Sequence, residues 1–91
     1  MPITAALLKI DAEHLADGLQ EARAKLDGAG GEMVLDFSSA RRVDSKAIHA
    51  LEELADLADA KAIRIVLRGV NVEIYKVLKL VNLVPRFCFL N

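Results

Sequence analysis

Few side chains in this sequence are of types that carry out chemistry. The two histidines are His14 and His49, and the one cysteine is Cys88. The histidines lie far apart, neither stands in a metal-ligand spacing, and Cys88 has no second cysteine with which to form a disulfide or a zinc cluster. Cys88 lies in a short apolar run and is expected to be a buried strand residue. We therefore expect no catalytic residue, no metal, no cofactor and no enzyme activity.

The pair Asp44-Ser45 is of a different kind. Both residue types are favoured at helix N-termini, where a side-chain oxygen accepts a hydrogen bond from a backbone N–H group that has no partner within the helix. From Ala47 onward, apolar residues recur at helical spacing, with acidic residues between them. A helix is therefore predicted to begin at this pair.

Strands and helices elsewhere in the chain must position these residues, and the sequence predicts that strands and helices alternate. A helix follows Asp11, which is its expected N-cap, and the glycines at 28, 30 and 31 are expected to end it. A third helix is expected after Asn71, another capping type. Buried strands are predicted at 33–37, 63–67 and 87–90. Residues 3–10 are either one edge strand or a lead-in.

This alternation predicts an α/β domain with three to four strands, mostly parallel, and about three helices packed on the sheet. The glycines at 28–31 follow a helix and precede a strand, so they do not form the phosphate-binding loop of a nucleotide fold. With 91 residues, 54% of them hydrophobic and 27% charged, residues 1–91 are expected to form one soluble domain.

Charge and hydropathy limit the possible locations and partners. No apolar run is long enough for a membrane helix and the start lacks the basic region of a signal peptide, so a cytoplasmic location is expected. The net charge is −1, but residues 1–60 carry six basic and twelve acidic residues, whereas residues 61–91 carry six and one. Internal pairing or a charged docking face could explain this asymmetry. Neither part is typical of a nucleic-acid binder.

The segment from Val34 to Ile48 resembles the signature of STAS domains, the family of anti-sigma factor antagonists. In that family, a strand ending in Asp-hydrophobic-Ser is followed by hydrophobic-Asp-Ser-Ser-Gly-Leu-Gly, and this chain has Asp36-Phe37-Ser38 and then Val43-Asp44-Ser45. Ile10-Asp11 resembles the family's Leu-Asp before the first helix. The segment from Ile65 to Leu83 resembles its later strand and helix, so the similarity spans roughly residues 8 to 90.

The resemblance implies a bacterial, regulatory, protein-binding domain in which Ser45 is phosphorylated by a partner kinase. Asp11 and Asp44 are then expected to lie near Ser45. A phosphate at a helix N-terminus would meet unpaired amides and the positive end of the helix dipole. Ser45 could instead simply cap the helix. The expected partner-binding residues are Asp11, Asp44, Ser45, Lys46, Ala47 and His49.

The sequence departs from the family pattern in two places. Lys46-Ala47-Ile48-His49 replaces Ser-Gly-Leu-Gly, which changes the fit of a partner and places a cation at the unfavourable end of the helix. The family also opens with a β-hairpin, whereas the chain before Asp11 allows at most one strand. An uncovered sheet edge would invite pairing with another chain or a homodimer.

Two functions fit this resemblance. The first is an anti-sigma factor antagonist, which binds a serine kinase that is also an anti-sigma factor and thereby regulates transcription by partner switching. The alternative is a STAS accessory subunit of a lipid-transport ABC system, which contacts the ATPase subunit and acts without phosphorylation.

Overall fold

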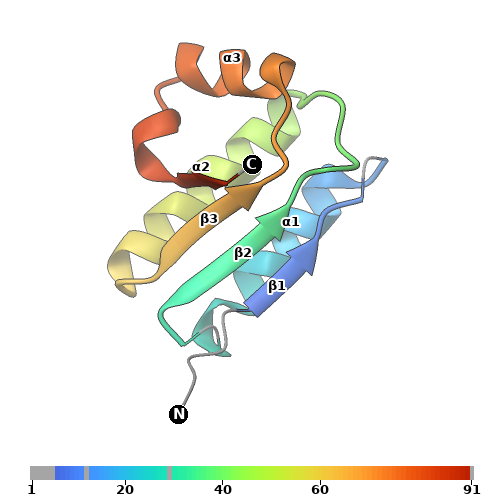
Figure 1. Ribbon diagram of the computed structural model, residues 1–91. Helices are drawn as coiled ribbons and strands as arrows, with labels where there is room; N and C mark the ends of the chain where they lie inside the picture. Colours follow the sequence, from blue (N-terminus) through green and yellow to red (C-terminus); the bar gives the residue numbers. More distant parts are fainter. Residues whose placement is uncertain (1–5, 12, 29, 91) are drawn as a thin grey trace.

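The computed structural model describes residues 6–11, 13–28 and 30–90. Its centre is one parallel four-stranded sheet in the order β1-β2-β3-β4 (Figure 1). The strands are β1 (Ala6–Lys9), β2 (Glu32–Asp36), β3 (Arg64–Arg68) and β4 (Cys88–Leu90). Each strand therefore pairs with the next strand along the chain.

Three helices connect these strands: α1 (Leu15–Ala24), α2 (Ser45–Ala60) and α3 (Val72–Leu80). Two short 3₁₀ turns follow α1 and α3, at Leu26–Gly28 and Val84–Arg86. Figure 1 shows α1 and α2 on the far side of the sheet, with α3 above the ends of the strands. The prediction of an α/β domain with three to four mostly parallel strands and about three helices is confirmed for the described residues.

The core lies between the sheet and the helices because alternate strand residues and one stripe of each helix are apolar. Met33 and Leu35 of β2 are fully buried, as are Leu51 and Leu54 of α2. The buried residues of α1 are Leu15, Leu19 and Ala22, and those of α3 are Ile74 and Leu78. Burial of these side chains supplies most of the free energy that favours folding.

Asp11 is not the N-cap of α1, and that prediction is wrong. The helix begins later, with His14 at the N-cap position and no side-chain cap hydrogen bond. The carboxylate of Asp11 instead accepts a hydrogen bond from the backbone N–H of Glu13 at 2.9 Å. Asp11 thus forms a local turn before the helix, a common role for aspartate because its short side chain reaches the backbone two residues on.

Two other details differ from expectation. The helix α1 ends at Ala24, before the glycines, while Gly30 and Gly31 take left-handed φ values of 67° and 104° in the turn that enters β2.

Cys88 lies in a strand as predicted, but it is exposed rather than buried. Its side chain belongs to the face of the sheet opposite the helices, because it pairs in register with Val66 rather than with a core residue.

The segment at 3–10 contains the strand β1, which pairs with β2. Residues 3–5 lie outside the described residues. None of the helices in the described part of the chain combines the length and the apolar composition needed to cross a membrane.

Candidate functional site

The start of α2 is built by Asp44. Its backbone is extended and its carboxylate accepts a hydrogen bond from the N–H of Ala47 at 2.8 Å. Its carbonyl oxygen accepts the first helical hydrogen bond, from the N–H of Ile48 at 3.0 Å. Asp44 is therefore the N-cap of α2, and the alternative in which Ser45 is the capping side chain is wrong.

Ser45 is the first residue of α2 and is exposed. Because the carboxylate of Asp44 already accepts the capping hydrogen bond, the hydroxyl of Ser45 is not needed to cap the helix. It lies where backbone N–H groups of the first turn point outward and where the helix dipole is positive. This is a place where an added anionic group would be stabilised.

Ser45 lies in a groove between the first two helices. We call it the α1–α2 groove, and its lining residues are Ala16, Gln20, Ser45, Lys46, His49, Ala50 and Glu53. One wall is formed by α1 and the other by the first turns of α2. Beyond the groove, Arg23 Nη1 lies 3.3 Å from Glu53 Oε1 and so links the two helices by an ion pair.

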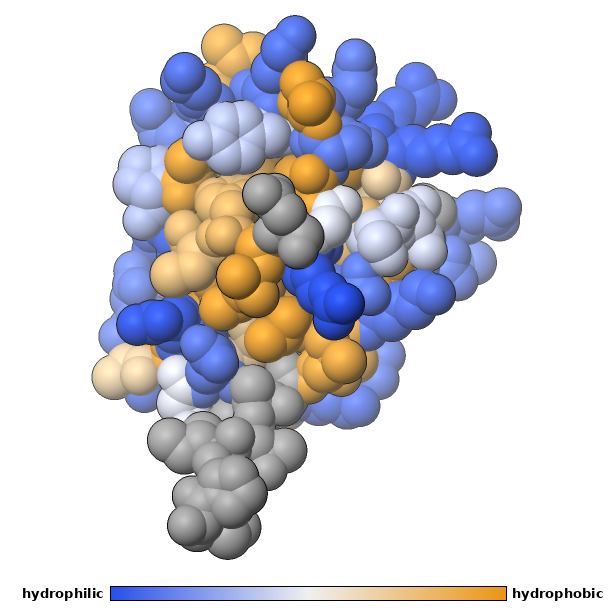
Figure 2. Space-filling view, in the orientation of Figure 1, coloured by the Kyte–Doolittle hydropathy of each residue, from blue (hydrophilic) through white to orange (hydrophobic). Residues whose placement is uncertain are grey.

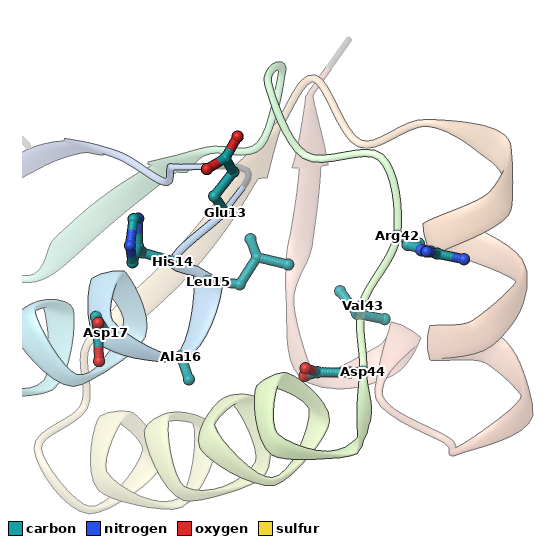
Figure 3. Close-up of a pocket in the computed structure, with 8 residues that line it drawn as sticks. All are labelled: Glu13, His14, Leu15, Ala16, Asp17, Arg42, Val43 and Asp44. Atoms are coloured by element: carbon teal, nitrogen blue, oxygen red, sulfur yellow. The ribbon is translucent and has the colours of Figure 1, made fainter.

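A second hollow adjoins this groove, and Ala16 lines both. Figure 3 shows His14 and Asp17 at the start of α1, Asp44 at the start of α2, and Arg42 directed away from α1. The lining residues are Glu13, His14, Leu15, Ala16, Asp17, Arg42, Val43 and Asp44. The two hollows together form a continuous surface on both sides of the Asp44-Ser45 pair.

The predicted partner-binding residues divide into three groups. Ser45, Lys46 and His49 line the α1–α2 groove, and Asp44 lines the hollow beside it. Asp11 lines a third hollow, with Lys9, Glu13 and Ser39, and Glu13 also lines the hollow beside Asp44. Ala47 is fully buried, so its assignment to a contact surface is wrong. Its side chain faces the core, because it lies on the same face of the helix as Ala50, Leu51 and Leu54.

Lys46 and His49 are the basic side chains that line the α1–α2 groove with Ser45. Lys46 is exposed, and within the described residues no carboxylate forms an ion pair with it. His49 is 77% exposed and its Nδ1 lies 3.7 Å from Glu52 Oε1. Both side chains are therefore available to an incoming group.

Asn71 contacts the loop that precedes Ser45. This contact could not be predicted from the sequence. Its side-chain oxygen caps α3 by accepting from the N–H of Ile74 at 2.8 Å, as predicted. Its side-chain nitrogen also donates to the carbonyl oxygens of Ala40 and Arg41, at 3.1 and 3.0 Å. One amide side chain thus fixes the start of α3 against the loop that leads into α2.

The α1 wall of the groove was also missed. Ala16 and Gln20 form this wall and are spaced by four residues, which places them on one side of the helix, and Arg23 continues the same side beyond the groove. This side of the helix could have been read from the sequence as a surface adjoining α2. Among the described residues no cluster of three or more potential metal ligands occurs.

Comparison with known proteins gives one family and several similar structures. The model of the STAS domain family matches residues 6–91. No curated protein sequence matches the chain.

Three solved structures illustrate the likeness. A sulfate transporter family protein from Wolinella succinogenes is 19% identical, with a TM-score of 0.80 over 98% of this chain and 79% of that one. RsbS from Moorella thermoacetica, in a variant form, is 21% identical, with a TM-score of 0.75 over 98% and 84%. A candidate anti-sigma factor antagonist from Thermotoga maritima is 16% identical, with a TM-score of 0.73 over 100% and 75%. At these identities the likeness concerns the fold.

Proposed function

The chain belongs to the STAS domain family, and we propose that it is a non-catalytic regulatory domain that binds a partner protein through the start of α2. The observation that carries this proposal is the exposed Ser45 at the first residue of that helix, beside a groove and relieved of capping by Asp44. The contact surface consists of the α1–α2 groove and the hollow that adjoins it.

Phosphorylation of Ser45 would switch this contact. A phosphate carries about 1.5 to 2 negative charges at neutral pH. At Ser45 it would meet the amides of the first turn, the positive end of the helix dipole and the free ammonium group of Lys46. The fold would therefore tolerate the modification, whereas an acidic or closely packed partner surface would be repelled.

The proposed partner is a serine kinase that also acts as an anti-sigma factor, in the cytoplasm of a bacterium. The similarity in fold to RsbS and to the Thermotoga maritima protein supports this choice, because the latter is described as a candidate anti-sigma factor antagonist. In this scheme, the unphosphorylated chain binds the kinase, and the kinase then releases its sigma factor.

The first prediction tests this proposal directly. Ser45→Asp is expected to weaken binding to the cognate kinase by about tenfold or more, because a carboxylate mimics part of the phosphate charge. Isothermal titration calorimetry against the kinase encoded in the same genome measures the affinity. Incubation of the wild-type chain with the kinase and ATP should add one phosphate, which mass spectrometry would place on Ser45.

Asn82→Asp is the matched control, since Asn82 is also exposed but follows α3 and lines neither the α1–α2 groove nor the hollow that adjoins it. This variant should bind as the wild type does, and both variants should melt within a few degrees of it. Equal affinity of the wild type and Ser45→Asp for the kinase would refute the switch.

The accessory subunit of a lipid-transport ABC system is the second candidate. The residues Lys46 and His49 favour it, because both are exposed and bulky at positions where a partner's backbone would approach a kinase-binding STAS domain closely. In that case the ATPase subunit would bind the wild type and Ser45→Asp equally, and Lys46→Glu would weaken its binding.

A further inference from the structure

The helices leave one face of the sheet without a partner. The strands follow one another in the order β1-β2-β3-β4, α1 and α2 lie on one face of the sheet, and α3 lies above the ends of the strands (Figure 1). Within residues 6–11, 13–28 and 30–90, no element covers the other face, which is the one turned toward the viewer in Figure 1. We call it the open face.

A row of apolar side chains crosses the open face. The register aligns Leu7 with Val34, Val34 with Val66, and Val66 with Cys88. Val66 is 5% exposed but does not belong to the core cluster, and Leu7 is 61% exposed. Figure 2 shows apolar side chains gathered across this face. Such a patch on a small domain is typical of an interaction surface.

Charged residues flank this row in a definite order. On one side, Glu32 of β2 is paired with Arg64 of β3, with 3.8 Å between Oε2 and Nη1. On the other side, Asp36 of β2 is in register with Arg68 of β3 and with Lys9 of β1. In both flanking rows β2 carries the negative charge and β3 the positive charge.

We propose that the open face is covered by a second copy of this chain, docked face to face about a twofold axis parallel to the strands. This rotation reverses the strand order, so that β2 lies over β3 of the second copy. Val34 then meets Val66 of the second copy, and Leu7 meets Cys88. The apolar row is complementary to itself, and two aligned sheets pack in this way at about 10 Å.

The charged residues that flank the apolar row favour this axis over a twofold axis perpendicular to the strands. It places Glu32 opposite Arg64 and Asp36 opposite Arg68 of the second copy, so that each flanking row forms a cluster of alternating sign. A twofold axis perpendicular to the strands would exchange the rows, placing Glu32 opposite Asp36 and Arg64 opposite Arg68. Like charges would then face each other, which disfavours that arrangement.

The size of the face sets the strength of the contact. Four strands about 4.8 Å apart and three to five residues long give a footprint of roughly 300 Å². Stable interfaces bury about 800 Å² per partner. The dimer is therefore expected to be weak, with dissociation in the micromolar range or above, so that it forms only as concentration rises.

A charge-exchange experiment tests the proposal. Sedimentation velocity of the wild type, from about 5 to about 500 µM, should show a monomer that converts to a dimer. Glu32→Arg alone and Arg64→Glu alone should each stay monomeric, because like charges then face each other. An equimolar mixture of the two variants should recover the dimer. A wild type that stays monomeric throughout, or a mixture that does not associate, would overturn the proposal.

Matched variants on α1 serve as the control. Glu21 of α1 and Lys25, the C-cap residue of that helix, form an exposed ion pair at 3.1 Å, so Glu21→Arg and Lys25→Glu should each dimerise as the wild type does. Two substitutions of apolar residues provide an independent test of the dimer. Leu7→Lys should abolish association, whereas Leu80→Lys, at a side chain 82% exposed on α3, should leave it unchanged.

Disulfide formation by Cys88 distinguishes this dimer from one formed by pairing of sheet edges. Face-to-face docking puts the two Cys88 residues at opposite edges, more than about 15 Å apart. Edge pairing through β4 would bring them close enough for a disulfide, which needs Cα atoms within about 7 Å. Under mild oxidation the dimer should form no Cys88 disulfide, and rapid formation of one would overturn the face-to-face arrangement. The test requires no kinase, so it stands apart from the proposed function.

Discussion

Asp44 and Ser45 are neighbours with separate roles at the start of α2. The carboxylate of Asp44 satisfies the backbone N–H of Ala47, whereas the hydroxyl of Ser45 is exposed beside the α1–α2 groove. Stability and the proposed partner binding thus involve different side chains. A substitution of Ser45 reports on binding because it removes no hydrogen bond that holds the helix.

This separation gives the second prediction. Asp44→Ala is expected to lower the free energy of unfolding by about 1 kcal/mol, since a helix N-cap is lost. In a domain of this size the melting temperature falls by about 4 to 8 °C. Ser45→Ala is expected to change stability by less than about 0.5 kcal/mol. Urea denaturation of both variants measures the difference, and equal losses would show that Ser45 shares the capping role.

Protonation of the Asp36 carboxylate at low pH is expected to destabilise the end of β2. Hydrogen bonds from the Ser38 hydroxyl, and then from its backbone N–H at 2.9 Å, hold the pKa of this carboxyl below its usual value. Arg68 and Lys9 lower the pKa further, while partial burial opposes the shift. The ionised form is therefore favoured in the folded state.

The third prediction follows from the direction of this shift. A carboxyl with a lower pKa in the folded state stabilises the fold above its unfolded pKa, and this contribution is lost as pH falls through the folded value. Asp36→Asn should therefore make the loss of stability as the pH falls below about 4 shallower than in the wild type. Urea denaturation at a series of pH values measures it. Identical pH profiles would contradict the assignment.

The loop from β2 to α2 is held by an element distant in the sequence. Asn71 follows β3, yet its side-chain nitrogen donates to Ala40 and Arg41, about thirty positions earlier. Gly69 supports the same approach, because a Cβ at that position would lie 3.0 Å from the Cβ of Ser38. The start of α2 is thus positioned by the end of β3 as well as by its own cap.

Two substitutions of Asn71 provide the fourth prediction. Asn71→Asp keeps the oxygen that caps α3 but loses both donated hydrogen bonds, at a cost of about 1 to 3 kcal/mol. Asn71→Ala loses the cap as well and should cost about 1 kcal/mol more. Hydrogen exchange of residues 38–44 should become faster in both variants. Unchanged exchange in that loop would mean that the two donated bonds do not hold it.

The contrast between Asn71 and Asp11 explains how far the sequence could predict these elements. Strands and helices were predictable because apolar residues recur with the periods of strands and helices, and Asn71 and Asp44 were recognisable as caps by type. Asp11 is of the same type but forms a turn, since several local conformations compete for an aspartate side chain. The donated bonds of Asn71 were not predictable because they depend on which strands become neighbours.

The molecule as a whole pairs its acidic and basic parts internally. Lys61 bonds to Asp27, Arg64 lies near Glu32, and Arg86 bonds to both Asp56 and Asp59. Three of the six basic residues of the last third thus meet acids of the first sixty residues. Because these side chains are partly or largely exposed, each pair contributes little to stability. Internal ion pairs thus account for half of the basic residues in the last third of the chain.

The sequential order of the strands also bears on how the protein is made. As the ribosome releases the chain, each new strand finds its neighbour already present in the strand made just before it. No strand has to be inserted between two others. Each parallel pairing must still close a crossover that contains a helix, so the sheet is expected to form more slowly than a sheet of hairpins.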